Sequence, residues 1–322
     1  MEETEPYEDL IKSLPTDPFG GSPPPLHQYK GFWFRQLTLQ GLLATHDYFI
    51  PLPSDVLLCS FQKTGTTWLK SLLFSIINRH SKDSLLSTNP HFLIPSLELQ
   101  IYRGGKLCTP ELLEKPSSSS RILSTHIPYQ LLPPFVKDSD CKIVYIARNP
   151  KDFIVSLWHF MVSNRHHHPV SLQEAVDGIC SGVFPGGPYF DHILGYWKES
   201  LESSSKRVFF VTYEDLKRDT AGHVRRLGEF LGCPFGVDDE QEVEEIVRIC
   251  SFETMRNVEV NKNEEQLWAN DERLIPRVTL SLKSLFRKGE VGDHVNHLTP
   301  EMIERIDEVA KERLSGSGLS LG

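Results

Sequence analysis

The sequence lacks the paired cysteines that a disulfide framework or a zinc site requires. Its six cysteines are scattered through 322 residues, and none forms a C-x-x-C pair. Reduced thiols in a cytosolic protein are therefore expected. His166, His167 and His168 follow one another beside Pro169, with no further ligands at metal-site spacing. This pattern predicts a solvated loop and no metal site.

The chain also lacks positive net charge and long apolar runs. It has 34 Lys and Arg against 43 Asp and Glu, a formal net charge of -9. Nucleic acids and anionic membranes need a basic surface, so neither is an expected partner. No apolar run reaches membrane-spanning length, and the acidic start at Met1 has no secretory signal. A soluble cytoplasmic protein is expected, in which any anionic ligand is held by a local cluster of donors.

Short apolar runs alternate with amphipathic segments along most of the chain. The predicted strands are residues 55–58, 121–126, 142–147 and 207–212. Strands that alternate with helices predict an α/β fold, with a central parallel sheet flanked by helices in a single domain. The expected organisation is a flexible, Pro-rich and Gly-rich N-terminal segment at 1–28, one domain at 29–314, and a loose tail at 315–322.

A tight loop follows the first predicted strand and precedes a segment with helical spacing. Gly65 is expected at the turn, with Thr66 or Thr67 capping the helix. The loop N–H groups and the helix N-terminus would attract an anion such as a phosphate, and Lys63 adds a positive charge. An ordinary strand-to-helix turn is the alternative from this stretch alone. The loop is not the nucleoside-triphosphate motif G-x-x-x-x-G-K-[ST], because its lysine precedes the glycine.

Functional side chains follow four of the predicted strands. Lys63, His126, Arg148 and Tyr213 each lie just after a strand. In a parallel sheet the carboxyl ends of the strands meet at one edge, where ligands bind. The sequence thus predicts two cations, an imidazole and a phenol at that edge.

Three stretches together resemble the cytosolic sulfotransferase family. Residues 59–70 (CSFQKTGTTWLK) resemble the family's 5′-phosphosulfate loop, a P-loop-like element. Residues 145–156 (YIARNPKDFIVS) resemble its 3′-phosphate segment, and residues 286–293 (FRKGEVGD) its R-K-G-x-x-G-D segment. The motifs follow the family order and spacing, and the resemblance runs from about residue 29 to the last predicted helix. Gly186-Gly187-Pro188 and Cys250-Ser251-Phe252-Glu253 look most like plant-type members.

This resemblance implies transfer of the sulfuryl group of 3′-phosphoadenosine 5′-phosphosulfate (PAPS) to a hydroxyl of a small acceptor, without a metal. The product would be adenosine 3′,5′-bisphosphate (PAP). Because the donor has two separate anionic ends, two basic sites are needed, and an Arg fork suits the 3′-phosphate. The residues that the resemblance assigns to the cofactor are Lys63, Thr64, Gly65, Thr66, Thr67, Trp68, Arg148, Ser156, Tyr213, Ser251, Phe252, Arg287, Lys288 and Gly289.

The catalytic residues implied by the resemblance are His126 and Lys63. His126 lies in a Thr-His-Ile-Pro stretch that aligns with the family's catalytic histidine, and it is expected to act as general base on the acceptor hydroxyl. Without the resemblance, a histidine at a strand end is more often structural. Lys63 is expected to stabilise charge on the bridging oxygen of the donor.

The acceptor pocket is expected to be apolar, which favours flavonoids, other phenols, steroids or hormone-like metabolites. Its expected lining is Phe32, Trp33, Tyr102, Phe153 and Trp158. For Phe32 and Trp33, which lie in an aromatic-rich stretch, core packing is the alternative. Two other functions stay open: a non-catalytic protein that binds PAPS or PAP, and a P-loop nucleotide kinase.

The chain departs from the family pattern at several positions. Phe61-Gln62 stands where Tyr-Pro is usual, and Gln62 restores a backbone N–H and a free φ angle. His294 stands where the family has Trp. The animal dimer motif K-x-x-x-T-V-x-x-x-E is not present after Asn296, so that dimer is not expected.

Overall fold

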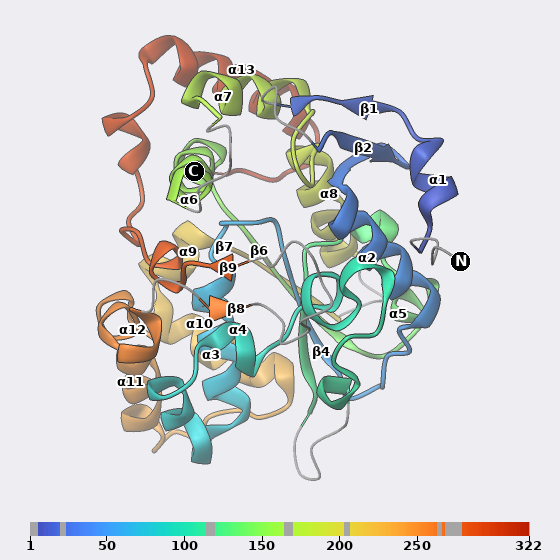
Figure 1. The fold of residues 1–322 in the computed structure, drawn as a ribbon. Coiled ribbons are helices and arrows are strands. Elements are labelled where there is room, and N and C mark those ends of the chain that lie inside the picture. Colours follow the sequence, from blue (N-terminus) through green and yellow to red (C-terminus); the bar gives the residue numbers. More distant parts are fainter. Residues whose placement is uncertain are drawn as a thin grey trace.

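A four-stranded parallel sheet lies at the centre of the chain (Figure 1). The computed structural model describes residues 6–19, 24–113, 120–163, 170–202, 207–262, 266–267 and 279–321. The strand order is β5 (Ile122–Thr125), β4 (Val56–Ser60), β6 (Lys142–Ala147) and β7 (Val208–Thr212). Every neighbouring pair is parallel. The predicted α/β fold with a central parallel sheet is confirmed.

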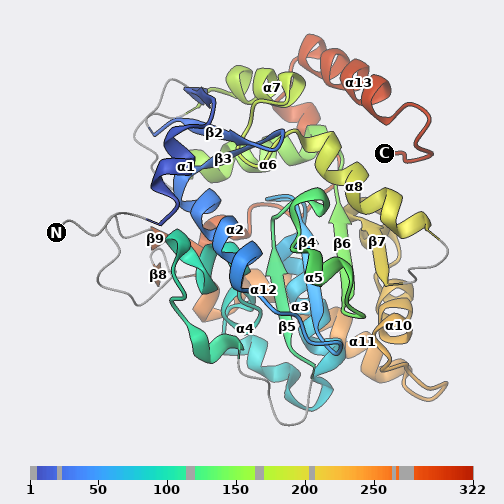
Figure 2. The same cartoon turned by 90° about the vertical axis from the view of Figure 1, so that its right-hand side faces the viewer.

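Alternate strand residues pack into two separate cores. Leu57 and Tyr145 belong to one buried cluster, while Leu58 and Val144 belong to the other. This alternation follows from the two-residue period of a strand. The first cluster is covered by α2 (Gln36–Tyr48), α6 (Pro150–Ser163) and α8 (Tyr189–Leu201). The second is covered by α3 (Thr66–Ile77), α10 (Thr220–Leu231) and α11 (Glu240–Ile249), so helices lie on both sides of the sheet (Figure 2).

Shorter elements surround these layers. The N-terminal sheet consists of β1 (Thr16–Asp17), β2 (Leu26–Tyr29) and β3 (Phe32–Arg35), and a two-stranded pair consists of β8 (Gln266–Leu267) and β9 (Thr279–Leu280). The remaining α-helices are α1 (Glu8–Lys12), α4 (Pro90–Leu93), α5 (Pro134–Lys137), α7 (Leu172–Ser181), α9 (Tyr213–Arg218), α12 (Phe252–Asn257) and α13 (Pro300–Leu314). Among the described residues, no helix combines the length and the apolar character needed to cross a membrane.

Described parts of residues 1–28 and 315–322, which are expected to be flexible and loose, make contacts with the rest of the chain. In the described part of the first segment, Ile11 and Phe19 are buried, and Phe19 packs edge-to-face on Phe184 at 5.1 Å. Proline limits the length of these elements, but short ones suffice to bury two apolar side chains. In the tail, the Ser317 carbonyl accepts a hydrogen bond from the Trp197 ring N–H at 2.8 Å. The Leu321 carbonyl accepts another from the Asn149 side chain at 3.2 Å, so two backbone carbonyls of this segment bond to side chains outside it.

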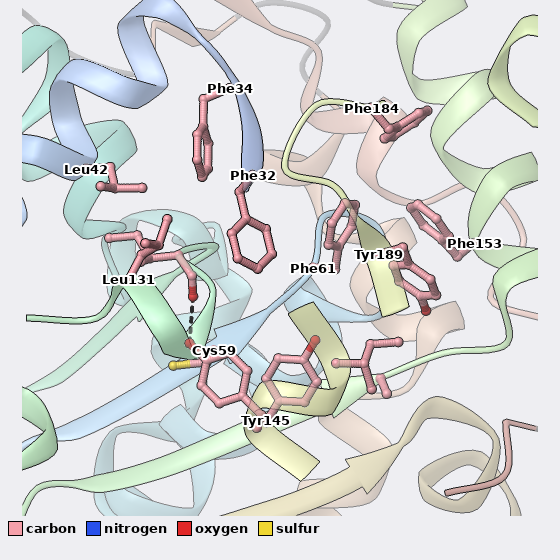
Figure 3. Close-up of a cluster of buried hydrophobic side chains, with 14 of the residues drawn as sticks. Phe32, Phe34, Leu42, Cys59, Phe61, Leu131, Tyr145, Phe153, Phe184 and Tyr189 are labelled. Atoms are coloured by element: carbon pink, nitrogen blue, oxygen red, sulfur yellow. Dashed lines mark hydrogen bonds between the residues drawn. The ribbon is translucent and has the colours of Figure 1, made fainter. Parts of the chain in front are cut away.

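An aromatic cluster fixes the start of the loop after β4 (Figure 3). The Phe61 ring packs edge-to-face on Phe153 at 5.2 Å and on Tyr189 at 5.1 Å. Phe153 in turn stacks on Tyr189 at 4.5 Å. The residue that replaces the family's usual tyrosine is thus a core residue, and it anchors the loop to α6 and α8.

Candidate active site

The loop between β4 and α3 has a backbone that glycine makes possible. Gly65 has φ 116°, and a Cβ there would lie 2.8 Å from Tyr213 Cδ2 and 2.9 Å from Ile146 Cδ1. The Thr64 hydroxyl is buried and donates to the carbonyl oxygens of Phe61 at 2.8 Å and Ile146 at 3.1 Å. The side chain of Thr64 therefore holds the loop to β6.

The predicted cap of α3 by Thr66 or Thr67 is wrong. The helix begins at Thr66, its N-cap is Gly65, and no side chain caps it. Both threonines already lie in the first turn, so their hydroxyls turn sideways: Thr66 Oγ1 pairs with Ser60 Oγ at 2.8 Å, and Thr67 Oγ1 with His91 Nε2 at 2.9 Å. The first N–H groups of α3 thus have no capping side chain, which suits an anion.

Lys63 occupies the centre of the loop with a positive φ of 62°. Its ammonium lies 3.3 Å from the Ser284 carbonyl oxygen and 4.4 Å from the centre of the Phe160 ring. Burial, together with the nearby Arg148 and Arg287, lowers the pKa of Lys63 to about 7. Burial and the two nearby guanidinium groups disfavour the ammonium form of Lys63, and a bound anion would stabilise that form.

His126 follows β5 and is held in one orientation. Its Nδ1 lies 2.7 Å from the Ser60 carbonyl oxygen, which can only accept, so Nδ1 carries the proton and Nε2 keeps its lone pair. Its backbone N–H donates to Glu98 Oε1 at 2.8 Å, and the Thr125 hydroxyl donates to Glu98 Oε2 at 2.8 Å. Burial lowers the pKa of His126, while the Glu98 carboxylate opposes that shift. The neutral ring has the form that a general base needs.

Arg148 follows β6 and stacks its guanidinium over the Tyr213 ring at 4.2 Å. One of its terminal nitrogens donates to the Glu290 carbonyl at 2.8 Å. Its Nε is buried and has no hydrogen-bond partner among the described residues. An unpartnered buried donor on an arginine is costly, so this atom fits an anionic ligand.

The C-terminal segment is pinned beside α6 and α12. Arg287 and Lys288 both donate to Asp293, at 2.5 Å and 2.6 Å. Gly289 has φ 69°, and a Cβ there would lie 2.4 Å from Phe252 Cδ2. Glycine is therefore required where this backbone crosses the Phe252 ring.

Three further residues that the resemblance assigns to the cofactor are Trp68, Ser251 and Ser156. Trp68 is partly exposed and packs edge-to-face on Tyr213 at 5.4 Å. The Ser251 hydroxyl caps α12 by accepting from the Thr254 N–H at 3.2 Å. Ser156 is buried on α6. These contacts connect Trp68 to Tyr213, and Ser251 to the start of the helix that carries Phe252.

The aromatic residues expected to line an acceptor pocket divide into two groups. Phe32, Tyr102 and Phe153 are buried, at 5%, 2% and 0% exposure. Phe153 packs in the aromatic cluster of the core, where it stacks on Tyr189. Trp33 and Trp158 keep some exposed surface.

Two features of this site have no clear signal in the sequence. Glu98 and His91 lie in the region 81–100, which reads mostly as loop, yet each contacts a predicted site residue.

Within the described ranges, no group of three or more His, Cys, Asp or Glu side chains is placed to hold a metal ion. The three consecutive histidines, His166 to His168, lie outside the described residues.

Comparisons with known proteins agree with this geometry. The sulfotransferase domain family matches residues 53–318. Cytosolic sulfotransferase 8 of Arabidopsis thaliana is 41% identical over 324 residues, which cover 99% of this chain and 94% of that protein. The crystal structure of an Arabidopsis thaliana sulphotransferase has a TM-score of 0.71 and 36% identity, covering 98% of this chain and 94% of the other. A mouse sulfotransferase complexed with PAP has a TM-score of 0.68 and 27% identity, covering 91% and 95% of the two chains.

Proposed function

The chain belongs to the sulfotransferase family, alongside the plant cytosolic sulfotransferases, and from this premise we propose that it transfers a sulfuryl group from PAPS to a hydroxyl of a small apolar acceptor. One observation carries the proposal. The carbonyl of Ser60 orients His126, while the hydroxyl of the same residue pairs with Thr66 at the start of α3. A base and an anion loop joined through one residue can act on one reacting pair of molecules.

The cofactor would be bound at its two anionic ends. The loop N–H groups and Lys63 suit the 5′-phosphosulfate, because they place a helix N-terminus and an ammonium at one point. Arg148, Arg287 and Lys288 suit the 3′-phosphate, and the unpartnered Nε of Arg148 supports this assignment. The mouse relative's complex with PAP supports the same class of ligand. Trp68 and Phe252 would flank the adenine.

Bound PAPS supplies the sulfuryl group. His126 Nε2 takes the proton of the acceptor hydroxyl as the new bond to sulfur forms, because Nδ1 is occupied by the Ser60 carbonyl. The Lys63 ammonium would stabilise the negative charge left on the phosphate oxygen of the donor as the bond between sulfur and that oxygen breaks. Glu98 fixes the backbone at His126 and favours the imidazolium that results.

The acceptor is proposed to be a flat hydroxylated molecule such as a flavonoid, another phenol or a steroid. Partly exposed aromatic rings at Trp33 and Trp158 support an apolar partner.

The test is a screen of such acceptors with PAPS, with sulfated products read by mass spectrometry. His126→Ala should lower turnover by about a hundredfold or more while PAP binding persists. Lys63→Ala should lower both turnover and PAP binding. His80→Ala, at an exposed position, is the matched control and should leave turnover unchanged. Near wild-type turnover in His126→Ala would contradict the general-base role, and PAP binding without any turnover in the wild type would indicate a binding protein.

A further inference from the structure

A buried lysine and histidine lie directly behind the anion loop, and the reaction described above does not use them. Lys70 is 1% exposed and His91 6% exposed. Lys70 Nζ lies 2.7 Å from the Ile94 carbonyl oxygen and 3.2 Å from His91 Nδ1. The other nitrogen of the same ring, Nε2, lies 2.9 Å from Thr67 Oγ1. The three side chains form a chain that ends at the first turn of α3.

The charged form of Lys70 fixes the direction of each hydrogen bond in this chain. An ammonium has donors only, so charged Lys70 donates to His91 Nδ1, which must then carry no proton. The proton of the neutral ring lies on Nε2, and Nε2 donates to Thr67 Oγ1. Burial lowers the pKa of His91 well below its ordinary value, which keeps the ring neutral. Burial also lowers the pKa of Lys70 to about 7, while the Glu98 carboxylate favours its charged form.

The Thr67 hydroxyl therefore accepts from His91 and must direct its own proton elsewhere. Among the described residues, His91 is its hydrogen-bond partner. A phosphate or sulfate oxygen accepts hydrogen bonds and donates none at neutral pH. A hydroxyl already committed to donate is preorganised for such a ligand, whereas a free hydroxyl must give up its other rotamers on binding.

The position of His91 is itself well defined. Its backbone N–H donates to Asn89 Oδ1 at 2.9 Å at the start of α4. The Asn89 side chain donates in turn to Asn261 Oδ1 at 2.7 Å. A histidine held in this way can orient its partner.

We propose that His91 and Lys70 are positioning residues that commit the Thr67 hydroxyl to donate to the 5′ anionic group of the bound nucleotide. This inference rests on the proposed function of the loop. It assigns no chemical step to either residue. Their effect should be on binding of the nucleotide and not on the acceptor.

The test compares His91→Phe, which removes the donor, with His91→Gln, which can keep one. The binding constant for PAP is measured by titration calorimetry, and KM for PAPS and for an acceptor by steady-state kinetics. His91→Phe should weaken PAP binding about tenfold and raise KM for PAPS similarly, because one charge-assisted hydrogen bond is lost. The kcat and the acceptor KM should change less than twofold. His91→Gln should recover part of the loss.

A double-mutant cycle with Thr67→Val separates positioning from a general structural effect. If His91 acts through Thr67, then His91→Phe should cost no further PAP affinity in the Thr67→Val background. Additive losses would overturn the proposal. Failure of the wild-type protein to bind PAP would instead overturn the proposed function of the loop.

A measurement on the unmutated protein keeps the inference testable even if the His91 variants do not fold. Protein labelled with ¹⁵N-histidine reports the tautomer of each ring through its nitrogen chemical shifts. We expect the Nε2–H tautomer for His91. The Nδ1–H tautomer would reverse the direction of the chain and contradict the proposal.

Discussion

The carboxylate of Asp152 on α6 accepts two hydrogen bonds from His294, a residue 142 positions away in the sequence. The backbone N–H of His294 donates to Oδ1 at 3.0 Å, and its ring Nδ1 lies 2.8 Å from the same atom. The other oxygen, Oδ2, accepts from the Gly292 N–H at 2.6 Å. One buried side chain thus holds the Arg287–Asp293 segment against the helix that follows Arg148. His294 stands in place of the family's usual tryptophan, and its ring supplies one of these three contacts.

Replacing Asp152 should separate the two basic segments. In Asp152→Asn the amide presents one acceptor oxygen where two oxygens now accept, so a buried donor loses its partner. We expect the free energy of unfolding to fall by about 2 kcal/mol. Urea denaturation at pH 7 measures this change. Asp238→Asn, at an exposed position, is the control and should change stability by less than about 0.5 kcal/mol.

The effect of Asp152→Asn should also depend on pH. Burial alone would raise the pKa of Asp152, but hydrogen bonds from Gly292 and His294 leave it lowered overall. A carboxyl whose pKa is lowered by folding contributes stability above its unfolded pKa of about 3.9 and loses it as the pH falls. The difference in unfolding free energy between wild type and Asp152→Asn should therefore shrink below about pH 4. A constant difference down to pH 2.5 would contradict this account.

Arg148→Lys tests the 3′-phosphate site. Lysine keeps the charge but loses the fork geometry and the stacking on Tyr213. PAP affinity should fall about thirtyfold, while affinity for adenosine 5′-monophosphate, which has no 3′-phosphate, should change less than threefold. Titration calorimetry with the two nucleotides measures the ratio. Equal losses for both ligands would place Arg148 away from the 3′ end, and Arg225→Lys serves as a distant control.

The strand ends were the most predictable part of this site. The residues in question are Lys63, His126, Arg148 and Tyr213. Each follows a strand of the parallel sheet, so recognising the apolar runs as strands is enough to place all four at one edge. Glu98 was not predictable, because its role comes from the hydrogen bonds that it accepts from Thr125 and His126, 27 and 28 positions away. A charged residue in an irregular segment gives no sign of burial. Tertiary packing decided its role.

Local capping rules failed at α3 for a related reason. Threonine is a good N-cap in isolation, which favours Thr66 or Thr67. In the fold, Gly65 must pass close to Tyr213 and takes the cap position itself. The threonine hydroxyls instead contact Ser60 on β4 and His91 on α4. Those partners could not be anticipated from the loop sequence.

Gly65→Ala should lower the stability of the protein by more than the strain of a positive φ alone. The new Cβ would meet Tyr213 Cδ2 and Ile146 Cδ1 below 3 Å. Gly31→Ala is the matched control, since Gly31 has φ 88° and no heavy atom lies within 4 Å of the place its new Cβ would take. We expect Gly31→Ala to cost about 1 kcal/mol, with Gly65→Ala costing at least about 2 kcal/mol and reducing PAP binding as well. Equal stability of the two variants would show that the loop can shift without loss.

The protonation of Lys63 should couple nucleotide binding to pH. In the free protein its pKa is lowered to about 7, and a bound anion favours the ammonium form. Above pH 7 binding must therefore take up a proton, and PAP affinity should fall by up to tenfold per pH unit. Calorimetry at pH 8.5 in buffers of different ionisation enthalpy should detect uptake of about one proton. Lys63→Met should abolish that uptake, whereas Lys106→Met, at an exposed position, should preserve it. Undiminished uptake in Lys63→Met would assign the proton to another group, and the ammonium could then no longer be placed at the anionic end of the nucleotide.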